Sequence, residues 1–417
     1  MHICFVHQNF PAQFGHVARA LVEKHGHRCT FVTEQAAGKS DGIDRIQFKM
    51  QGGATQKNHY CSRTFENCVW QAHAIYEALK ARADIQPDLI VAHSGLGCSL
   101  FLRELYRCPI INYFEFFYHT TSSDMDFRPD FPASELDRLR ALTRNAMLLL
   151  DLHNCERGYS PTSWQRSRLP QEYQGKIEVI FDGIDTSIWK PRPRPPLRVV
   201  GNHVVPEGVR IVTYVSRGFE SMRGFDIFMK IAKQLCDQRR DVVFAVVGQD
   251  RICYGGDQKV IGQPSFKDWV LKQDKFDLSR IHFLGQLPPE ELAQLLAISD
   301  LHIYLTVPFV LSWSLMNALA CGCTVLASCT PPVEEMIQHR KTGLLADFFD
   351  LDCFLSLAHQ VLDHPEDYRG LGEAGMKMIQ EKYSLEVCLP QMIRLYQEVA
   401  GKEDSKFDLP LTEDASF

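Results

Sequence analysis

Apolar and polar positions alternate between two periods along this chain of 417 residues. Short apolar runs predict buried strands, and the longer segments between them repeat apolar residues at helical spacing. In the first half, the predicted strands are Ile3 to Val6, Cys29 to Thr33, Leu89 to Ala92 and Ile110 to Phe114, and the predicted helices are Gly15 to His25, Arg63 to Ala83 and Ser99 to Tyr106. Such alternation with short connections is typical of βαβ units in a parallel, doubly wound sheet.

A second series begins after residue 200. Its predicted strands are Ile211 to Val215, Val242 to Val247, Ile281 to Phe283, Leu301 to Leu305 and Thr324 to Ala327, and its predicted helices are Phe225 to Gln238, Phe266 to Gln273, Pro289 to Ile298 and Ser314 to Cys321. Between the two series lies the proline-rich stretch from Lys190 to Pro196, which predicts a stiff linker. The sequence therefore predicts an α/β protein with two Rossmann-like, doubly wound domains facing each other across a cleft.

Composition narrows the class of partner. The chain is 45% hydrophobic and 23% charged, and its net charge of −6 offers no surface for nucleic acid. Its 14 cysteines are scattered without the spacing of a metal knuckle, which favours reduced thiols over disulfides. Since neither a signal peptide nor an apolar run of spanning length is found, we expect a cytoplasmic protein, with peripheral contact to a membrane left open.

The segment from Thr306 to Gly322 is the most informative part of the chain. A predicted strand runs into a short turn, and an apolar helix opens directly after it. The first-turn N–H groups of such a helix are unpaired and carry partial positive charge, so they can bind an anion such as a nucleotide diphosphate. An ordinary βα unit is the alternative interpretation.

Charged and small residues follow several other predicted strands. Arg217 and Arg223 follow Ile211 to Val215 and could both reach one diphosphate, although two solvated loop arginines would give the same pattern. His93 and Glu115 end two first-half strands, where parallel sheets bind ligands, and for each a structural role is the alternative. No Gly-x-Gly-x-x-Gly turn and no convincing metal site is found.

These segments together resemble the retaining GT-B glycosyltransferases of family 4. The resemblance covers nearly the whole chain. The matching stretches are the opening Met1 to Leu21, His93 to Leu105, Tyr113 to Tyr118, Ser160 to Arg166, Ile180 to Thr186, Tyr214 to Phe225 and Pro308 to Gly322.

The resemblance implies a hexosyltransferase-like enzyme that holds a nucleotide-diphosphate sugar, first of all a UDP- or GDP-sugar, in its second domain. Catalytic roles are implied for Arg217, Arg223, Glu115 and His93. The implied donor-binding residues are Gly15, Ser216, Gly248, Gln249, Asp250, Gly285, Leu287, Pro308, Val310, Leu311, Ser312, Trp313, Ser314 and Asn317. The leaving phosphate takes the acceptor proton in this family, so no cofactor, metal or protein nucleophile is expected.

Two positions depart from the family pattern. Family 4 enzymes commonly carry glutamates where this chain has Phe309 and Asn317, and the second glutamate grips the nucleotide ribose. Many relatives also carry a histidine near the position of Glu115. A non-catalytic GT-B subunit that binds or scaffolds is therefore the main alternative, and a nucleotide-sugar epimerase is a third. The acceptor could be a glycan, a lipid, a protein or a small molecule.

The resemblance also predicts the domain boundaries. Residues 1–190 would form the acceptor-binding domain and residues 191–382 the donor-binding domain. Residues 383–400 would form a helix that crosses back to the first domain, and residues 401–417 a flexible tail.

Overall fold

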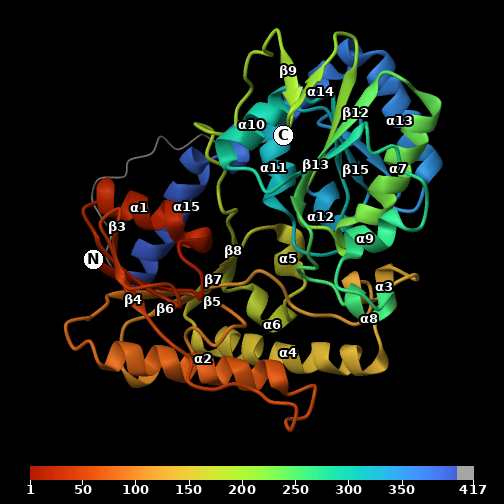
Figure 1. The fold of residues 1–417 in the computed structure, drawn as a ribbon. Coiled ribbons are helices and arrows are strands. Elements are labelled where there is room, and N and C mark those ends of the chain that lie inside the picture. The colour runs from red at the N-terminus through yellow and green to blue at the C-terminus, as the bar shows by residue number, and fades with distance from the viewer. Residues whose placement is uncertain (402–417) are drawn as a thin grey trace.

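The computed structural model describes residues 1–401, and the tail expected at its end lies, except for Gly401, outside this part of the chain. Two α/β units face each other (Figure 1). The first is built on an eight-stranded sheet that is parallel except for the β3–β4 pair. In spatial order its strands are β3 (Gly38–Ser40), β4 (Ile43–Gln47), β2 (Arg28–Thr33), β1 (His2–Val6), β5 (Leu89–His93), β6 (Ile110–Tyr113), β7 (Arg157–Ser160) and β8 (Ile177–Val179).

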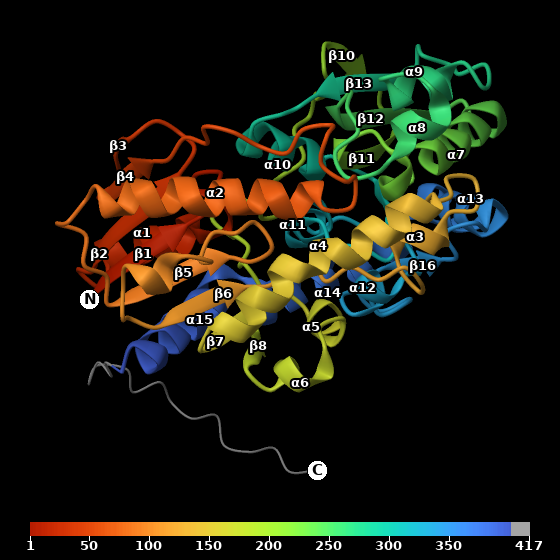
Figure 2. The ribbon, with the colours of Figure 1, turned by 90° about the horizontal axis from the view of Figure 1, so that it is seen from below.

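Helices cover both faces of the first sheet, which explains why its central strands β1 and β5 are buried throughout. Helices α2 and α4 run side by side beneath the sheet, and α1 and α15 lie together above it (Figures 1 and 2). The helices of this unit are α1 (Gly15–Glu23), α2 (Arg63–Lys80), α3 (Asp124–Phe127), α4 (Glu135–Asn154), α5 (Ser163–Ser167) and α6 (Gln171–Gln174), with 3-10 turns η1 (Ala12–Phe14) and η2 (Leu102–Glu104).

The second unit is built on a six-stranded, fully parallel sheet. In spatial order its strands are β13 (Ile281–Gly285), β12 (Val242–Gln249), β11 (Arg210–Gly218), β14 (Leu301–Tyr304), β15 (Val325–Ser328) and β16 (Leu344–Ala346). A separate hairpin pairs β9 (Arg198–Val200) with β10 (His203–Val205). Two doubly wound parallel sheets confirm the predicted fold class.

The second sheet is also covered on both faces. Apolar residues of α7 and α13 pack into one core cluster, and those of α10 and α11 pack into another. The helices are η3 (Ser221–Arg223), α7 (Phe225–Gln238), α8 (Asp257–Ile261), α9 (Phe266–Leu271), α10 (Pro289–Ala297), α11 (Trp313–Ala320), α12 (Pro331–Glu334), α13 (Leu351–Asp363), α14 (Pro365–Met378) and the π-helical turn η4 (Ile379–Tyr383).

Two segments cross between the units. Helix α15 (Leu385–Ala400) returns to the first unit, where the Tyr396 hydroxyl lies 3.1 Å from that of Tyr159. In the opposite direction, residues 124–131 reach into the second unit. The Arg128 guanidinium is buried there and pairs with Asp226 of α7 at 2.7 Å. The domain boundaries themselves stay a prediction.

Two first-half helices differ from the prediction. The segment from Ser99 to Tyr106 forms only the short turn η2, preceded by glycines 95 and 97 at positive φ. Conversely, the pattern did not predict α4. This helix buries some of its leucines and exposes others, so its apolar periodicity is weak. The exposed leucines are Leu136, Leu139, Leu142, Leu149 and Leu150.

Candidate active site

The loop after β14 leads into α11 as the strand-to-helix pattern predicted, with the helix starting at Trp313 instead of Ser314. Ser312 caps the helix, because its side chain accepts a hydrogen bond from the Ser314 N–H at 3.2 Å. The Ser312 N–H donates in turn to the Tyr304 hydroxyl at 3.1 Å. Two of the amides expected to bind phosphate therefore already have partners, which they would exchange for phosphate oxygens.

Arg223 lies directly beside this helix opening. Its side chain is buried and donates to the Thr306 hydroxyl at 2.7 Å and to the Val310 carbonyl at 3.0 Å. A longer contact of 3.5 Å reaches Tyr304, the residue that also accepts from Ser312. These bonds fix the guanidinium against the loop that opens α11, so its position does not depend on a ligand.

Arg217 is exposed and lies on the same side of the sheet. It donates to the Tyr254 hydroxyl at 3.3 Å. The Tyr254 ring lies near both guanidinium groups, 5.9 Å from that of Arg217 and 5.4 Å from that of Arg223. The structure thus brings the two predicted arginines and the first turn of α11 together around Tyr254.

The ends of the neighbouring strands contribute less than predicted. Gly248 has φ 153°, and a Cβ there would lie 2.6 Å from the carbonyl oxygen of Ser216, so only glycine fits. The Gln249 amide donates to the side chain of Gln286 at 2.7 Å. Asp250 instead accepts from Ser265, the cap of α9, and pairs with Lys267 at 3.5 Å. A structural role explains these contacts of Asp250.

Other predicted donor-site residues lie at varied distances from the arginines. Gly285 has positive φ at the end of β13, and Leu287 packs, partly buried, against the apolar core. Pro308 precedes Phe309 in the loop before α11. Gly15 opens α1 in the first unit, where it lies close against Pro11. The described contacts do not bring Gly15 or Leu287 to the arginine pair.

The opposite wall of the cleft carries His93 and Glu115. His93 ends β5, is buried, and its Nδ1 lies 2.8 Å from the Ser94 carbonyl, to which it can donate. Its Nε2 lies 3.6 Å from a carboxylate oxygen of Glu115, whose side chain is 40% exposed. The two residues therefore act as a pair that presents one accessible carboxylate to the cleft.

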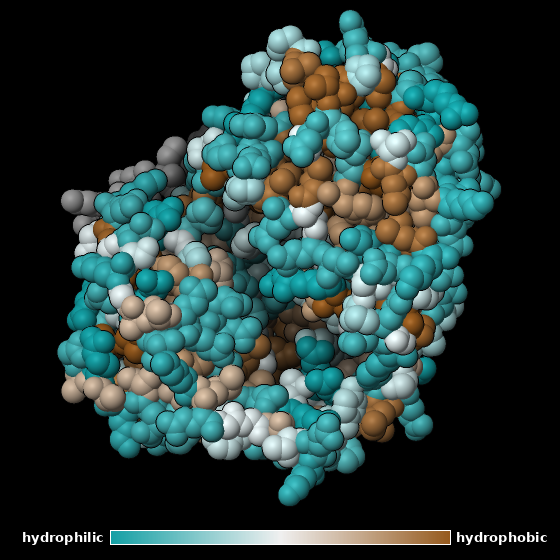
Figure 3. Space-filling view, in the orientation of Figure 1, coloured by the Kyte–Doolittle hydropathy of each residue, from teal (hydrophilic) through white to brown (hydrophobic). Residues whose placement is uncertain are grey.

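Side chains near the site also join the walls. The Trp313 indole N–H, at the start of α11, donates to Asp182 of the first unit at 2.8 Å. The rings of Phe116 and Phe309 meet with centroids 4.7 Å apart. Burial raises the pKa of the Asp182 carboxyl to about 7, against the hydrogen bond from Trp313, which lowers it. In the space-filling view, the surface is hollowed between the two units (Figure 3).

Sequence reasoning missed Tyr254 and Glu220. One carboxylate oxygen of the buried Glu220 accepts from three successive N–H groups, those of Cys253, Tyr254 and Gly255. This fixes the loop that carries Tyr254 above the arginines. The loop of Tyr254 joins β12 to α8 and has no periodic pattern, so no local signal marks Tyr254. Glu220 lies within the matching stretch Tyr214 to Phe225, but its role was not predicted from the sequence.

The described part of the chain adds two findings about sites of other kinds. Residues 1–401 contain no group of three or more histidine, cysteine, aspartate or glutamate side chains placed to hold a metal ion. In the same range, no helix has both the length and the apolar character that crossing a bilayer requires.

Two family models match the chain in succession. Residues 25–189 match the Glycosyl transferase family 4 group, and residues 200–378 match the Glycosyl transferases group 1. The chain belongs to the GT-B glycosyltransferases. This confirms the family that the sequence motifs indicated.

Curated glycosyltransferases are distant relatives. The chain is 25% identical over 224 residues to N-acetyl-alpha-D-glucosaminyl L-malate synthase of Bacillus anthracis. The aligned residues cover 54% of this chain and 54% of that protein. It is 25% identical over 334 residues to D-inositol 3-phosphate glycosyltransferase of Corynebacterium glutamicum, covering 78% of this chain and 75% of the relative. The chain thus spans about half the length of the first relative and three quarters of the second.

Solved glycosyltransferase structures share the fold at low identity. Sucrose-phosphate synthase from Thermosynechococcus elongatus superposes with a TM-score of 0.72 at 17% identity, covering 96% of this chain and 99% of that one. Anabaena HepE, solved in complex with UDP and glucose, gives a TM-score of 0.66 at 13% identity, covering 95% and 100%.

Within this GT-B frame, the two departures from the family pattern have clear positions. Phe309 is buried in an aromatic group with Phe116 and Tyr254, and its ring lies 5.7 Å from the Arg223 guanidinium. Asn317 is partly exposed on α11, three residues beyond Ser314 and thus on the same helix face. An aromatic surface therefore replaces a carboxylate beside Arg223, while Asn317 leaves a neutral amide on the open face.

Proposed function

We propose that this protein is a retaining glycosyltransferase that moves a sugar from a nucleotide-diphosphate sugar to an acceptor hydroxyl. The observation that carries the proposal is the placement of Arg217 and Arg223 on one side of the second sheet, beside the opening of α11. Two cations and a helix N-terminus in one place suit a diphosphate better than any other common ligand.

The donor would lie with its diphosphate between the arginines and the first turn of α11. The names of the similar structures support a nucleotide, because HepE was solved with UDP and glucose, and starch synthase IV from Arabidopsis thaliana with ADP and acarbose. We propose a UDP- or GDP-sugar. The partly exposed Asn317 would face the ribose.

In the proposed reaction, the acceptor oxygen bonds to the anomeric carbon on the face that the diphosphate leaves. The bond from that carbon to the β-phosphate oxygen breaks, and the departing phosphate takes the acceptor proton. The configuration is therefore retained. Arg217 and Arg223 stabilise the charge that develops on the diphosphate, so the scheme needs neither a metal nor a protein nucleophile.

Glu115 and His93 would act on the acceptor side. Glu115 lines a pocket of the first unit next to His93. Its exposed carboxylate can accept a hydrogen bond from the attacking hydroxyl, and His93 would fix its orientation. Two curated relatives are named for L-malate and D-inositol 3-phosphate, which supports a small hydroxylated acceptor.

Nucleotide binding tests the proposal. Thermal unfolding of the full chain should shift upward with UDP or GDP, and the shift should grow with the logarithm of ligand concentration above Kd. In Arg223→Gln the apparent Kd for UDP should weaken at least tenfold, while the weak shift with uridine stays unchanged. Equal losses with uridine and UDP would show that Arg223 does not bind the diphosphate.

Product analysis tests the reaction type. Once a donor and acceptor pair turns over, nuclear magnetic resonance of the fresh product should show the anomeric configuration of the donor, and excess EDTA should leave the rate unchanged. An inverted product would contradict the retaining scheme. Stabilisation by none of the nucleotides would favour the alternative of a non-catalytic GT-B subunit, which Asn317 in place of the usual glutamate suggests.

A further inference from the structure

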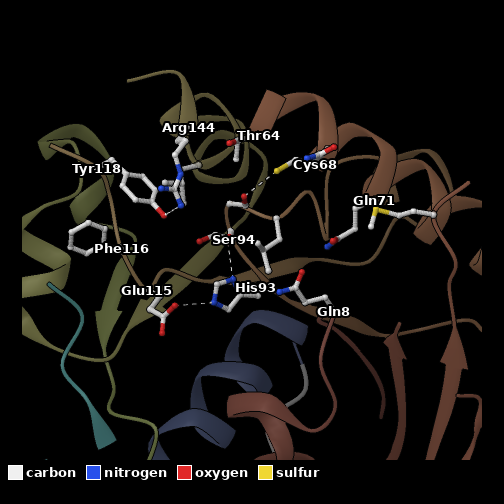
Figure 4. A pocket seen from close by; sticks show the side chains of 15 residues that line it. Gln8, Thr64, Cys68, Gln71, His93, Ser94, Glu115, Phe116, Tyr118 and Arg144 are labelled. Atoms are coloured by element: carbon white, nitrogen blue, oxygen red, sulfur yellow. Dashed lines mark hydrogen bonds and ion pairs between the residues drawn. The ribbon is translucent and has the colours of Figure 1, made fainter. Parts of the chain in front are cut away.

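The first unit contains a cavity of about 420 Å³ that opens next to Glu115 and His93. Its walls come from the loops after β1, β5 and β6 and from the facing sides of α2 and α4 (Figure 4). Phe116, which contacts Phe309 of the second unit, also lines it. A monosaccharide-sized molecule in this cavity would therefore lie beside the proposed donor sugar.

One fixed cation lines the cavity. Arg144 of α4 lies with its guanidinium 3.8 Å from the centroid of the Tyr118 ring and donates a hydrogen bond to the Tyr118 hydroxyl (Figure 4). Within residues 1–401, it forms no ion pair with a carboxylate. Since arginine keeps its charge at every physiological pH, this side of the cavity is permanently positive.

Two carboxylates lie near the cavity, and neither forms an ion pair with Arg144 among the described residues. Glu115 lies at the floor, where it pairs with His93 (Figure 4). Asp124 is close enough for Arg144 to lower its pKa, but burial dominates and raises that pKa to about 6. The cation and the accessible carboxylate thus occupy different parts of the same cavity.

Uncharged polar groups occupy the space between. The Ser94 side chain is buried and lines the cavity, and its hydroxyl has no hydrogen-bond partner among the described residues. Gln8, Asn67 and Gln71 also line the cavity, and the amides of Asn67 and Gln71 already bond to Ala54 and Cys98. A buried hydroxyl without a partner is costly unless a ligand supplies one.

We propose that the acceptor is a small hydroxylated compound with a phosphate or carboxylate group, which the Arg144 guanidinium binds while one hydroxyl lies at Glu115. This assignment rests on the proposed function and adds the chemical class of the acceptor to it. Arginine's planar fork matches the oxygens of either anion, and Ser94 and the amides suit the hydroxyls. Repulsion from Glu115 keeps the anionic end away from the reacting site.

Anion binding by the full chain tests the assignment. With the donor site filled by saturating UDP, thermal shifts are measured with inorganic phosphate and with malonate against chloride at matched ionic strength. The two anions separate a phosphate site from a carboxylate site. At least one should stabilise the wild type, and its apparent Kd should weaken at least tenfold in Arg144→Gln. Arg138→Gln, an exposed arginine on the same helix, is the matched control and should bind as the wild type does.

The outcomes are decisive in both directions. No stabilisation of the wild type by either anion, or equal stabilisation of Arg144→Gln, would overturn the assignment. The thermal shift with UDP shows whether each variant is folded. Arg144→Lys keeps the positive charge but loses the planar guanidinium, so it should give an intermediate Kd for the anion. Absence of a shift with both UDP and GDP in the wild type would instead refute the proposed donor site, so the two failures are distinguishable.

Discussion

The two walls of the cleft are organised in opposite ways. Under the proposed function, the wall with Arg223 is the donor wall and the wall with Glu115 is the acceptor wall. On the donor wall, Arg223 is buried and held by Thr306 and Val310, and Glu220 fixes the loop of Tyr254 through three backbone bonds. On the acceptor wall, Glu115 is 40% exposed and Ser94 has an unpartnered hydroxyl among the described residues. The donor wall is preorganised for one kind of charge, whereas the acceptor wall leaves polar groups for a ligand to satisfy.

This difference fits what each wall has to bind. A diphosphate is the same in every nucleotide sugar, so its site can be fixed by buried bonds. An acceptor varies between enzymes of one fold, and its recognition depends on side chains from several loops and helices. Variants on each wall can test whether the walls differ in this way, and variants between them can test what holds the walls together.

The largest effect should come from the buried ion pair between the walls. Asp226→Ala leaves the Arg128 guanidinium buried without its partner, so the free energy of unfolding should fall by about 3–5 kcal/mol in chemical denaturation. Replacing both partners, as Arg128→Met with Asp226→Leu, should recover most of the loss. The exposed pair Arg369 and Glu366 is the control, and Arg369→Ala should cost less than about 1 kcal/mol.

A second test concerns Glu115 on the acceptor wall. Glu115→Gln removes the exposed charge of the pair with His93 but keeps its shape, so kcat should fall about 100-fold. The UDP-dependent thermal shift should not change, because the donor contacts lie on the other wall. Unchanged turnover would remove Glu115 from the mechanism.

The sequence predicted the donor wall better for a physical reason. Arg217 is one of the last two residues of β11, Arg223 follows that strand, and the first turn of α11 follows β14, which lies beside β11 in the sheet. Strand ends and helix starts leave local patterns in the chain, and parallel topology brings them together. The proximity of the two arginines to this helix could therefore be inferred from the sequence alone.

The acceptor wall could not be predicted in the same way. Arg144 and Tyr118 come from different elements, and α4 itself was missed because its exposed leucines obscure the helical period. Residues 124–131, which include Arg128, pack into the core of the second unit although they belong to the first half of the chain. Such contacts arise from tertiary packing, which a local pattern does not record.

A third, smaller effect is expected from Asn317 on the donor wall. Asn317→Glu would restore the charge that relatives of this family use on the ribose, so UDP should bind about tenfold more tightly, in keeping with the roughly 1–2 kcal/mol between neutral and charged hydrogen bonds. The gain should vanish with 2′,3′-dideoxy-UDP, which lacks the ribose hydroxyls. An equal gain with both nucleotides would show that the new carboxylate acts elsewhere.

The last test concerns the pH dependence of Asp182, whose bond to Trp313 joins the walls. Burial raises its pKa from 3.8 to about 7, so between about pH 4 and pH 7 the folded protein holds a proton that the unfolded chain releases. Folding stability from this residue is therefore lost as the pH rises through that window, and the loss is complete above pH 7. Asp182→Asn keeps an acceptor for the indole N–H without titrating.

The variant should therefore match the wild type near pH 4 and exceed its Tm at pH 8, where the wild type has lost this contribution completely. Burial also raises the pKa of Asp151 to about 7. Asp151 is present in both proteins, so it contributes the same dependence of Tm on pH to each. Parallel curves of Tm against pH would mean that Asp182 is ionised throughout. The Trp313 indole N–H would then donate to an ionised carboxylate, and the hydrogen bond between the donor wall and the acceptor wall would be a charged one instead of a neutral one.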